Sequence, residues 1–451
     1  MTDITPALAT ELVGELDADL AEAGRLGKIA RYLRGNHDKP YMPRGAKKEY
    51  EHLADRAVTN WLPLVSETFA KGLFVDGLRL PKATSNAEAW AFWQRNGMDA
   101  RQTIAHRGAL EYGTSYVLVL PGDTAPVIRP LSPLKSAAWY AEDDDEYPEV
   151  AISLDGTTRD KKRLLSVYSA TERVRFELAA GDGAKWTEIE RTDHGIGYTP
   201  FVRFRDRLDG EAVGVISPLI TLQDRVNEIV FATLIALQYA SFRQRWATGL
   251  AIPLDDDGNP VEPFQAAVDR LWVSEDSDAK FGDFAQTDIS GHINLTEAAV
   301  RTMAAIAQIS PSVLMGDMVN VSGDALARLE ASTQRKLDSL ETLFGESWEL
   351  VFRTAARVGN LEEISDDAQV RWRDSEARSL AATVDALGKQ AQMLQVPVEA
   401  LWEQIPGVTD QDVERWKSMK ASDPFAQLAN ELTGATAESA ETLTAAEPEA
   451  E

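Results

Sequence analysis

The sequence predicts an α+β protein that is mostly helical and contains an antiparallel β-sheet. Long stretches toward both ends of the chain repeat apolar residues at helical spacing. Between about residues 114 and 206 the pattern changes to short apolar runs separated by Gly and Asp turns, which is typical of antiparallel strands. Hydrophobic residues are 44% and charged residues 26% of the chain, so we expect globular units with well-formed cores.

The N-terminal part of the chain is predicted to be helical. In the first expected helix, residues 5–34, apolar residues such as Leu8 and Leu12 recur at helical spacing. The loop GNHDKPYMPRG follows and is rich in helix-breaking residues. Further helices are expected near 48–71 and 87–112.

The middle part of the chain is predicted to form the sheet, from about 114 to 206. Its strand-like runs include TSYVLVLPG, RLLSVYSATERVRFELAA and YTPFVRFRDR. The run GDGAK at 181–185 is superficially similar to a phosphate-binding loop, but it lacks the Lys-Ser or Lys-Thr ending. We therefore interpret it as a hairpin turn, and the acidic run EDDDEYPE at 142–149 as a solvated turn.

A long helix is expected from Pro218 to about Ala247. Ser217 suits its N-cap, Pro218 its first turn and Gly249 its C-terminal end. Between residues 229 and 240 the helix is apolar almost all the way round, whereas a surface helix would show a polar face. The run is too short to cross a membrane, and charged residues bracket it.

Other elements must therefore cover this helix on several sides. We expect Gln238 and Gln244 to face solvent or a partner, because they are the polar exceptions in the run. The residues expected to be buried are Phe231, Leu234, Leu237 and Trp246.

The longest helix is expected from Asp324 to about Val358, between a Ser322 cap and Gly359. A strand is expected at 369–374, and helices at 375–394, after Pro397 and at 409–419. From about residue 422 the chain has few large apolar residues, so we expect it to be disordered. The apolar face of the longest helix consists of Leu326, Leu329, Leu337, Leu340, Phe344, Trp348, Val351 and Phe352.

No common catalytic, cofactor or metal motif is present in the sequence. Phosphate-loop, dinucleotide-binding, zinc-protease and serine-hydrolase patterns are all missing. The chain has no cysteine, which excludes disulfides and thiolate sites, and its five histidines lack metal-ligand spacing. The acidic runs DADL and EDDDE have no EF-hand pattern. We therefore predict no catalytic residue, no cofactor and no metal site.

The charge balance argues against simple nucleic-acid binding. Acidic residues outnumber Lys and Arg by 72 to 46, for a formal net charge of -26. A surface that grips phosphates is built from Lys and Arg, so contact with DNA is expected to be weak or repulsive. The acidic N-terminus lacks the basic region of a signal peptide, and no apolar run is long enough for a membrane span.

The order of several segments resembles that of SPP1-type portal proteins of tailed bacteriophages, as they occur in phages of actinobacteria. The resemblance covers about 50–420. Each motif is loose, but their order and spacing together are specific. The segments are TNWLPLVSETFAKGLFVDGLRL, ALEYGTSYVLVLPG, GYTPFVRFRDR with GVISPLITLQDRVNEIVFATLIALQ, AAIAQISPSVLMGDMVNVSGDALARLE and VPVEALWEQIPGVTDQDVERW.

The resemblance implies a mostly helical subunit with an antiparallel sheet in a wing, long stem helices and a small clip. The wing would occupy about 1–290, with the 218–247 helix as its spine. The stem, clip and channel-facing helix would lie within 291–395. We expect the 324–358 helix in the stem and the 369–374 strand in the clip.

The resemblance also assigns the end of the chain. Residues 396–421 would form a small helical, crown-like end, and residues 422–451 a disordered acidic tail. On this interpretation the apolar face of the 324–358 helix packs the stem or a subunit interface. The wing core would contain Phe231, Leu234, Leu237 and Trp246.

The function that the resemblance implies is structural rather than enzymatic. A ring of about twelve copies would form at the capsid vertex of the virion, after assembly in the host cytoplasm. Double-stranded DNA would pass through its channel without sequence specificity, and an acidic lining would repel phosphates and lower friction. The implied partners are the terminase large subunit, the head-tail connector, and the major capsid and scaffolding proteins, with no membrane.

Two alternatives remain open at this stage. One is a different ring-forming or scaffold component of the phage head, which the shape of the subunit would distinguish. The other is an acidic hydrolase that uses paired carboxylates, which requires two acids to converge in a concave pocket.

Overall fold

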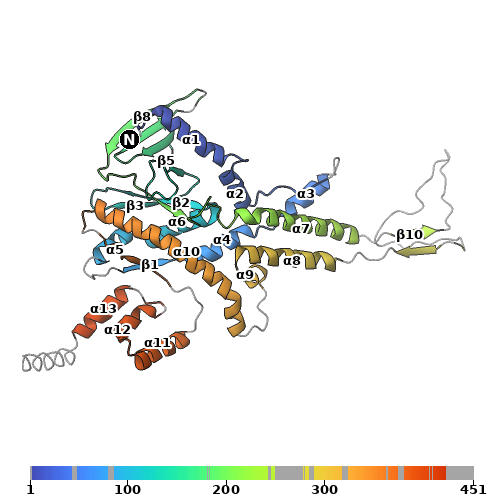
Figure 1. Ribbon diagram of the computed structural model, residues 1–451. Helices are drawn as coiled ribbons and strands as arrows, with labels where there is room; N and C mark the ends of the chain where they lie inside the picture. The colour runs from blue at the N-terminus through green and yellow to red at the C-terminus, as the bar shows by residue number, and fades with distance from the viewer. Residues whose placement is uncertain are drawn as a thin grey trace, which may run out of the picture.

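The fold is that of an α+β protein with a body and a projecting arm (Figure 1). The chain is 51% helical and 19% strand, and every strand pairing among the described residues is antiparallel, which confirms the predicted class. The computed structural model describes residues 3–42, 48–79, 86–179, 181, 183–241, 245–248, 278, 280–283, 289–316, 323–361, 364–373, 380–405, 407–408 and 410–422.

The N-terminal helices are shorter than the sequence pattern suggests. The stretch 5–34 forms two helices, and the stretch 48–71 forms two more. Gly24 lies at the first break, where a Cβ atom would come within 2.3 Å of the Asp19 carbonyl oxygen, so only glycine fits. The helices are α1 (Pro6–Leu20), α2 (Arg25–Leu33), α3 (Lys48–Ala57) and α4 (Leu62–Gly72).

The stretch predicted as one helix at 87–112 is also divided. Gly97 has a φ of +61°, a left-handed conformation that ends one helix and begins the next. The elements here are β1 (Val75–Arg79), α5 (Asn86–Arg95) and α6 (Met98–Tyr112).

The predicted single sheet between 114 and 206 is two sheets. A five-stranded meander is inserted between the second and third strands of a three-stranded sheet, and it forms its own sheet in chain order. The two meet where Tyr168 packs on Phe201, with ring centroids 5.1 Å apart. The small sheet has the order β3 (Val127–Leu131), β2 (Thr114–Leu120), β9 (Phe201–Arg205). The meander is β4 (Ser136–Trp139), β5 (Val150–Thr157), β6 (Arg163–Tyr168), β7 (Glu172–Leu178) and β8 (Trp186–Asp193).

The core of the body lies where the long helix α10 (Gly323–Val358) crosses the three-stranded sheet and α5. Trp348 is at its centre, with the rings of Trp93 and Phe204 edge-on at 4.9 and 4.7 Å. The indole Nε1 of Trp348 donates a hydrogen bond of 2.8 Å to Nε2 of His106. Burial lowers the pKa of His106 to about 3, so this imidazole is neutral.

The 324–358 helix, which the resemblance places in the stem, packs in the body. The described part of its apolar face lies on the sheet of its own chain and is at most 5% exposed. The side chains of Leu326 and Leu329 lie outside the described residues. The buried members of the predicted face are Leu337, Leu340, Phe344, Trp348, Val351 and Phe352.

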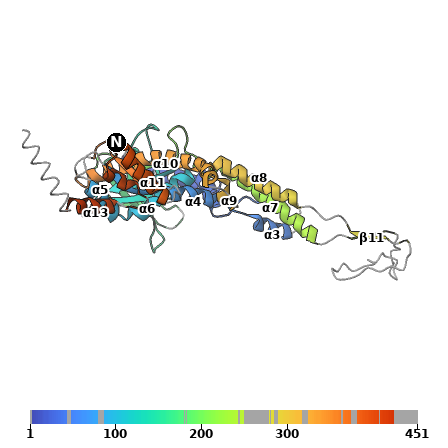
Figure 2. The same ribbon diagram turned by 90° about the horizontal axis from the view of Figure 1, so that it is seen from below.

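A two-helix arm projects from the body instead (Figures 1 and 2). Its first helix, α7 (Ile220–Ser241), runs outward, and α8 (Ser290–Ala307) returns beside it. The 218–247 helix, which the resemblance makes the spine of the wing, therefore has most of its length outside the body. The short pair β10 (Arg245–Thr248) and β11 (Lys280–Asp283) lies at the far end, and η1 (Ser217–Leu219) and α9 (Pro311–Met315) lie at the root.

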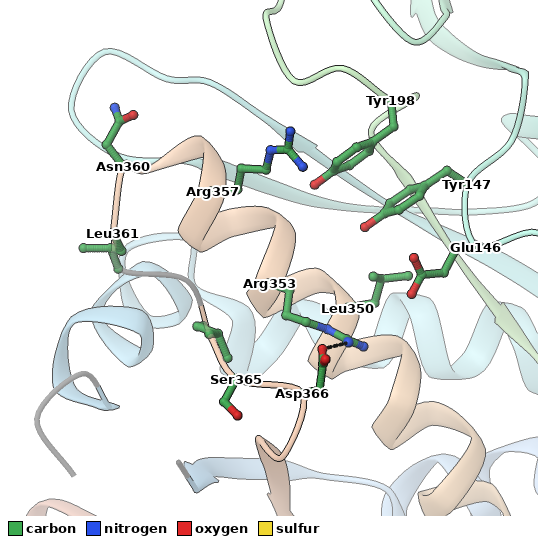
Figure 3. Close-up of a pocket in the computed structure, with 11 residues that line it drawn as sticks. Glu146, Tyr147, Tyr198, Leu350, Arg353, Arg357, Asn360, Leu361, Ser365 and Asp366 are labelled. Atoms are coloured by element: carbon green, nitrogen blue, oxygen red, sulfur yellow. Dashed lines mark hydrogen bonds and ion pairs between the residues drawn. The ribbon is translucent and has the colours of Figure 1, made fainter. Parts of the chain in front are cut away.

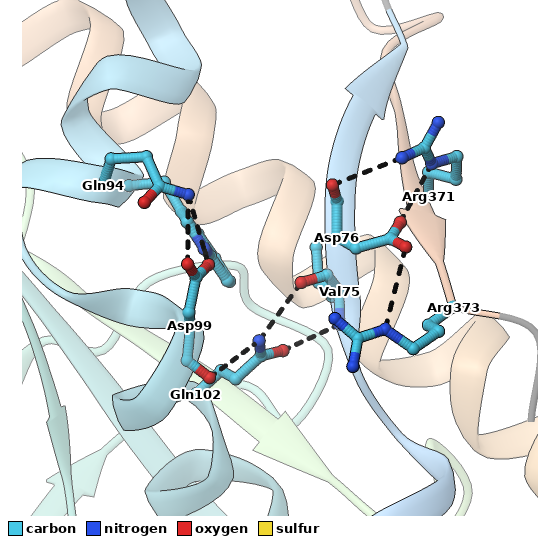
Figure 4. A network of polar contacts seen from close by, with 8 residues as sticks. Val75, Asp76, Gln94, Asp99, Gln102, Arg371 and Arg373 are labelled. Atoms are coloured by element: carbon cyan, nitrogen blue, oxygen red, sulfur yellow. Dashed lines mark hydrogen bonds and ion pairs between the residues drawn. The ribbon is translucent and has the colours of Figure 1, made fainter. Parts of the chain in front are cut away.

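The strand β12 (Gln369–Trp372), which the resemblance places in the clip, pairs with β1 of the body. Asp76 on β1 forms ion pairs with Arg371 and Arg373, and Gln102 of α6 bonds both backbone groups of Val75 (Figure 4).

The last helices of the described chain lie below the body (Figure 1), close to the predicted positions. They are α11 (Leu380–Leu394), α12 (Val398–Leu401), η2 (Trp402–Gln404) and α13 (Asp410–Ala421). The predicted tail lies outside the described residues apart from Ser422.

Candidate functional site: the projecting arm, its root and a cavity

The packing of the arm explains why its first helix, α7, is apolar almost all the way round. On one side α7 packs against α8, whose buried residues include Val300 and Met303. On another side it packs against α3, where Phe231 joins Ala54 and Ala57 in a separate apolar cluster. The root half of α7 is therefore covered by its own chain.

The outer half of α7 is less covered than expected. Phe231 is 8% exposed, as predicted, and Leu234 is half-buried, but Leu237 is 39% exposed. The prediction for Leu237 concerns an assembled ring, so its exposure in a single copy leaves it a prediction. Gln238 is exposed, as predicted, whereas Gln244 and the side chain of Trp246 lie outside the described residues.

The returning helix α8 carries more exposed apolar side chains, which the sequence analysis missed. Ile293, Leu295 and Ile306 are 50%, 57% and 51% exposed. Their signal in the sequence is an apolar pattern too wide for a single buried face. Apolar side chains gathered on one projecting element are typical of a protein contact surface.

Buried amides at the root fix the direction of α7. Gln223 accepts a hydrogen bond of 3.0 Å from the Trp61 amide and donates one of 2.6 Å to the Thr59 carbonyl oxygen. Asn227, 1% exposed, accepts from the Thr59 amide at 3.3 Å and from Gln223 at 3.0 Å. Its Nδ2 donates to Nδ1 of His37 at 2.8 Å. These bonds tie α7 to the segment that precedes α4.

The root of the arm also contains a tyrosine hydroxyl that lies between two carboxylates. The Tyr32 hydroxyl lies 2.8 Å from Asp224 on α7 and 2.9 Å from Asp38. A phenol has one proton to donate, so it satisfies one carboxylate at a time. Burial raises the pKa of Asp224; burial also acts on Asp38, but hydrogen bonds from Tyr32 and Arg31 outweigh it and lower that pKa. Asp224 is thus the more readily protonated of the two.

A cavity of about 1160 Å³ opens at the C-terminal end of α10 (Figure 3). The rings of Tyr147 and Tyr198 stack 3.9 Å apart in its wall. The Arg357 guanidinium lies over Tyr198 at 5.2 Å, and Arg353 forms a 2.9 Å ion pair with Asp366. The cavity thus combines an aromatic wall with two guanidinium groups.

The acidic run at 142–149 is less free than predicted, because Asp143 accepts hydrogen bonds from Arg203 and Arg205 of β9. Within the described ranges no group of three His, Asp or Glu side chains is arranged to hold a metal ion. In the same part of the chain no helix is long and apolar enough to cross a membrane.

Comparisons with known proteins point to one family. The family model described as phage portal protein, SPP1 Gp6-like, matches residues 15–424. The portal proteins of Mycobacterium phages L5 and D29 are each 24% identical to the chain, and each match covers 72% of this chain and 71% of the relative.

Two solved structures of gene transfer agent particles are similar to the chain at 13% identity and a TM-score of 0.45. One is a virion and the other the neck of an empty particle; the matches cover 82% and 84% of this chain and 93% and 96% of theirs. A similarity at this level adds nothing to the assignment.

Proposed function

The chain belongs to the SPP1 Gp6-like family of phage portal proteins, and from this premise we propose that it forms a closed ring around a channel for double-stranded DNA. The arm is the observation that carries the proposal. Its exposed apolar side chains lie on both helices, with Leu237 on α7 and Ile293 and Leu295 on α8. A head-to-tail ring contact joins two different surfaces of the same chain, so α7 of one copy would meet α8 of the next.

The arm also takes over the role first expected of the 324–358 helix. We assign the stem to α7 and α8, because this helix pair leaves the body and returns to it. The clip then lies between them, at the end that bears β10 and β11. The two sheets, α1 to α6 and α10 form the wing, and α11 to α13 form a small crown.

The ring of about twelve copies would sit at the capsid vertex of the virion after assembly in the host cytoplasm. Its proposed partners are the terminase large subunit, the head-tail connector, and the major capsid and scaffolding proteins. DNA would pass without sequence recognition, since a net charge of -26 per copy offers phosphates no overall attraction.

Family membership argues against both alternatives. Portal proteins are structural, so the family gives no reason to expect catalysis by paired carboxylates. A scaffold component of another kind would not be expected to match the portal family over residues 15–424.

The experiment that tests the ring proposal measures particle mass. Wild-type protein should form one closed species of about twelve subunit masses by mass photometry, with a central channel in electron images. The double variant Ile293→Glu and Leu295→Glu should dissociate into monomers, because each contact would otherwise bury two carboxylates without cationic partners.

The control for this test is Ile189→Glu on β8, since Ile189 is 44% exposed but lies away from the arm. This variant should still form rings. A wild-type protein that stays monomeric at micromolar concentration would contradict the proposal, and rings formed equally well by the double variant would contradict the role of the arm.

A further inference from the structure

The cavity at the end of α10 is lined by the guanidinium of Arg357. Among the described residues no carboxylate pairs with Arg357, whose contact there is the face of the Tyr198 ring. An arginine stacked on an aromatic ring keeps its planar edge of N–H donors free to bind a carboxylate. Figure 3 shows this side chain beside the two tyrosines and above the open space.

The second guanidinium is only partly satisfied. Arg353 pairs with Asp366, but the side chain of Asp366 is 93% exposed, so solvent weakens this ion pair. Nε of Arg353 is buried and has no hydrogen-bond partner among the described residues. The described partners of the two arginines therefore leave N–H donors for one further acceptor in the cavity.

The residues that line the cavity determine which kind of anion fits it. The hydroxyls of Tyr147 and Tyr198 both lie within hydrogen-bonding distance of Thr354, which holds the rings in place. Leu350 and Ile364 add apolar surface, and Glu146 contributes a negative charge. A polyanion such as DNA would be repelled by Glu146 and by the adjoining groove that contains Asp338, Glu341, Glu346 and Glu349. One isolated carboxylate on a peptide of small and apolar residues suits these walls better.

The chain carries such a sequence. Residues 423–451 contain seven Asp and Glu residues and no Lys or Arg, and most of these acids are separated by Ala, Thr, Ser, Leu or Pro. The position of the cavity favours this segment. Gly359, at the end of α10, lies within 2.6 Å of Phe92 on α5 when a Cβ is placed on it, and Figures 1 and 2 place α5 and α13 at the same end of the molecule. The 29 residues beyond position 422 have a maximal reach on the order of 100 Å.

We propose that the cavity between α10 and the two tyrosines binds a carboxylate of the acidic segment 423–451, with Arg357 as its main contact. The proposal does not depend on ring formation. The segment adds a ligand that neutralises the arginine pair, and it ties the end of the chain to the wing. Salt weakens the contact, because the groups lie at a solvent-open cavity.

Disulfide trapping in the full-length chain tests this proposal, because the natural sequence has no cysteine to interfere. Ser365→Cys places one thiol at the cavity. The second thiol is placed in turn at Ala437, Ala440, Ala446 and Ala450. We expect at least one pair to cross-link under mild oxidation, with a yield about tenfold above the control.

The control thiol is Thr342→Cys, which is also exposed and on α10 but lines the acidic groove. Adding Arg357→Gln to the trapped pair should lower its yield to the control level, whereas Arg357→Lys should keep part of it. A cross-link within one chain leaves the mass of a single chain on a denaturing gel, and a cross-link to a neighbouring copy doubles it.

Equal yields at Ser365 and Thr342, or a yield that Arg357→Gln leaves unchanged, would overturn the proposal. A failure of this test leaves ring formation untouched, since the ring contacts are on the arm. A protein that forms no rings but still shows the cross-link would contradict the ring proposal and support the binding of segment 423–451 in the cavity.

Discussion

Trp348 and His106 share a buried hydrogen bond that joins α10 to α6 at the centre of the body. His106 is neutral, with Nε2 accepting from the indole and Nδ1 facing the Leu73 carbonyl oxygen at 3.2 Å. The tautomer follows from these partners, because the nitrogen near a carbonyl must carry the proton. Each partner is therefore dependent on the other, and removal of one leaves a buried polar atom unsatisfied.

Trp348→Phe should lower the free energy of unfolding by about 1–3 kcal/mol beyond the loss of ring volume, because it leaves Nε2 of His106 buried without a donor. Denaturant unfolding monitored by circular dichroism measures this loss. Trp90→Phe is the matched control, since Trp90 stacks on Trp93 in the same cluster. Equal losses in the two variants would show that the hydrogen bond contributes little.

Glu111 on α6 predicts a pH dependence of stability. Burial raises its pKa to about 7, although a hydrogen bond of 3.2 Å from Ser66 works in the opposite direction. The folded-state pKa lies above the unfolded value, so the contribution of the protonated acid is complete below about pH 4.5 and is lost as pH rises through about 7. Glu111→Gln should therefore raise the Tm by several degrees at pH 8 and by little at pH 4.5.

The measurement for Glu111 is the difference in Tm between wild type and variant across this range of pH. Glu297→Gln, at an exposed position on α8, serves as the control and should show no such pH-dependent difference. A difference in Tm between wild type and Glu111→Gln that stays constant at all pH values would contradict the raised pKa of Glu111.

At the scale of elements, the root of α7 determines where the arm points. Asn227→Ala should destabilise the protein by about 1–3 kcal/mol, because it removes the partners of the Thr59 amide, Gln223 and His37 from a buried site. Thermal unfolding and mass photometry together measure the loss of stability and of assembly. Gln238→Ala, on the exposed outer part of the same helix, should change neither strongly.

The sequence predicted most elements but not their grouping. Capping residues and breakers place the ends of helices, so the predicted 324–358 helix agrees with α10. Apolar periodicity shows that a face is buried but not which element covers it, so it did not reveal that α10 packs in the body and that α7 projects from it. Gly24 and Gly97 were inside helical patterns that they interrupt, because a close backbone approach and a positive φ cannot be seen in a residue pattern.

The candidate site was harder to predict than the fold. Ile293 and Leu295 lie in the first turns of α8, at the outer end of the arm, and nothing in their local sequence encodes that distance from the body. The cavity at the end of α10 unites Tyr147 and Tyr198 from the sheet region with Arg353 and Arg357 from α10, which are more than a hundred residues apart in the chain. The tertiary fold brings these residues together, so no fixed spacing in the sequence could have predicted the cavity.

At the scale of the whole molecule, charge and shape act in opposite directions during assembly. A net charge of -26 makes copies repel one another, and the repulsion is screened over about 10 Å at ordinary ionic strength. The apolar surface of the arm supplies short-range attraction that does not depend on salt. A ring of this chain would therefore be held by contacts at the arm against repulsion that is spread over the body.

Polar contacts hold both helices of the arm to the body at its root. Gln223 and Asn227 anchor α7, while Ser310, just after α8, donates its amide to Thr333 of α10 at 3.2 Å. The arm is thus a lever with its pivot in the body. Twenty-two residues of helix extend about 33 Å, so a tilt of about 10° at the pivot moves the far end by about 6 Å. A change of less than one ångström at Tyr32, Asp38 or Asp224 is enlarged several-fold at β10 and β11, where it would widen or narrow an opening shared by all copies.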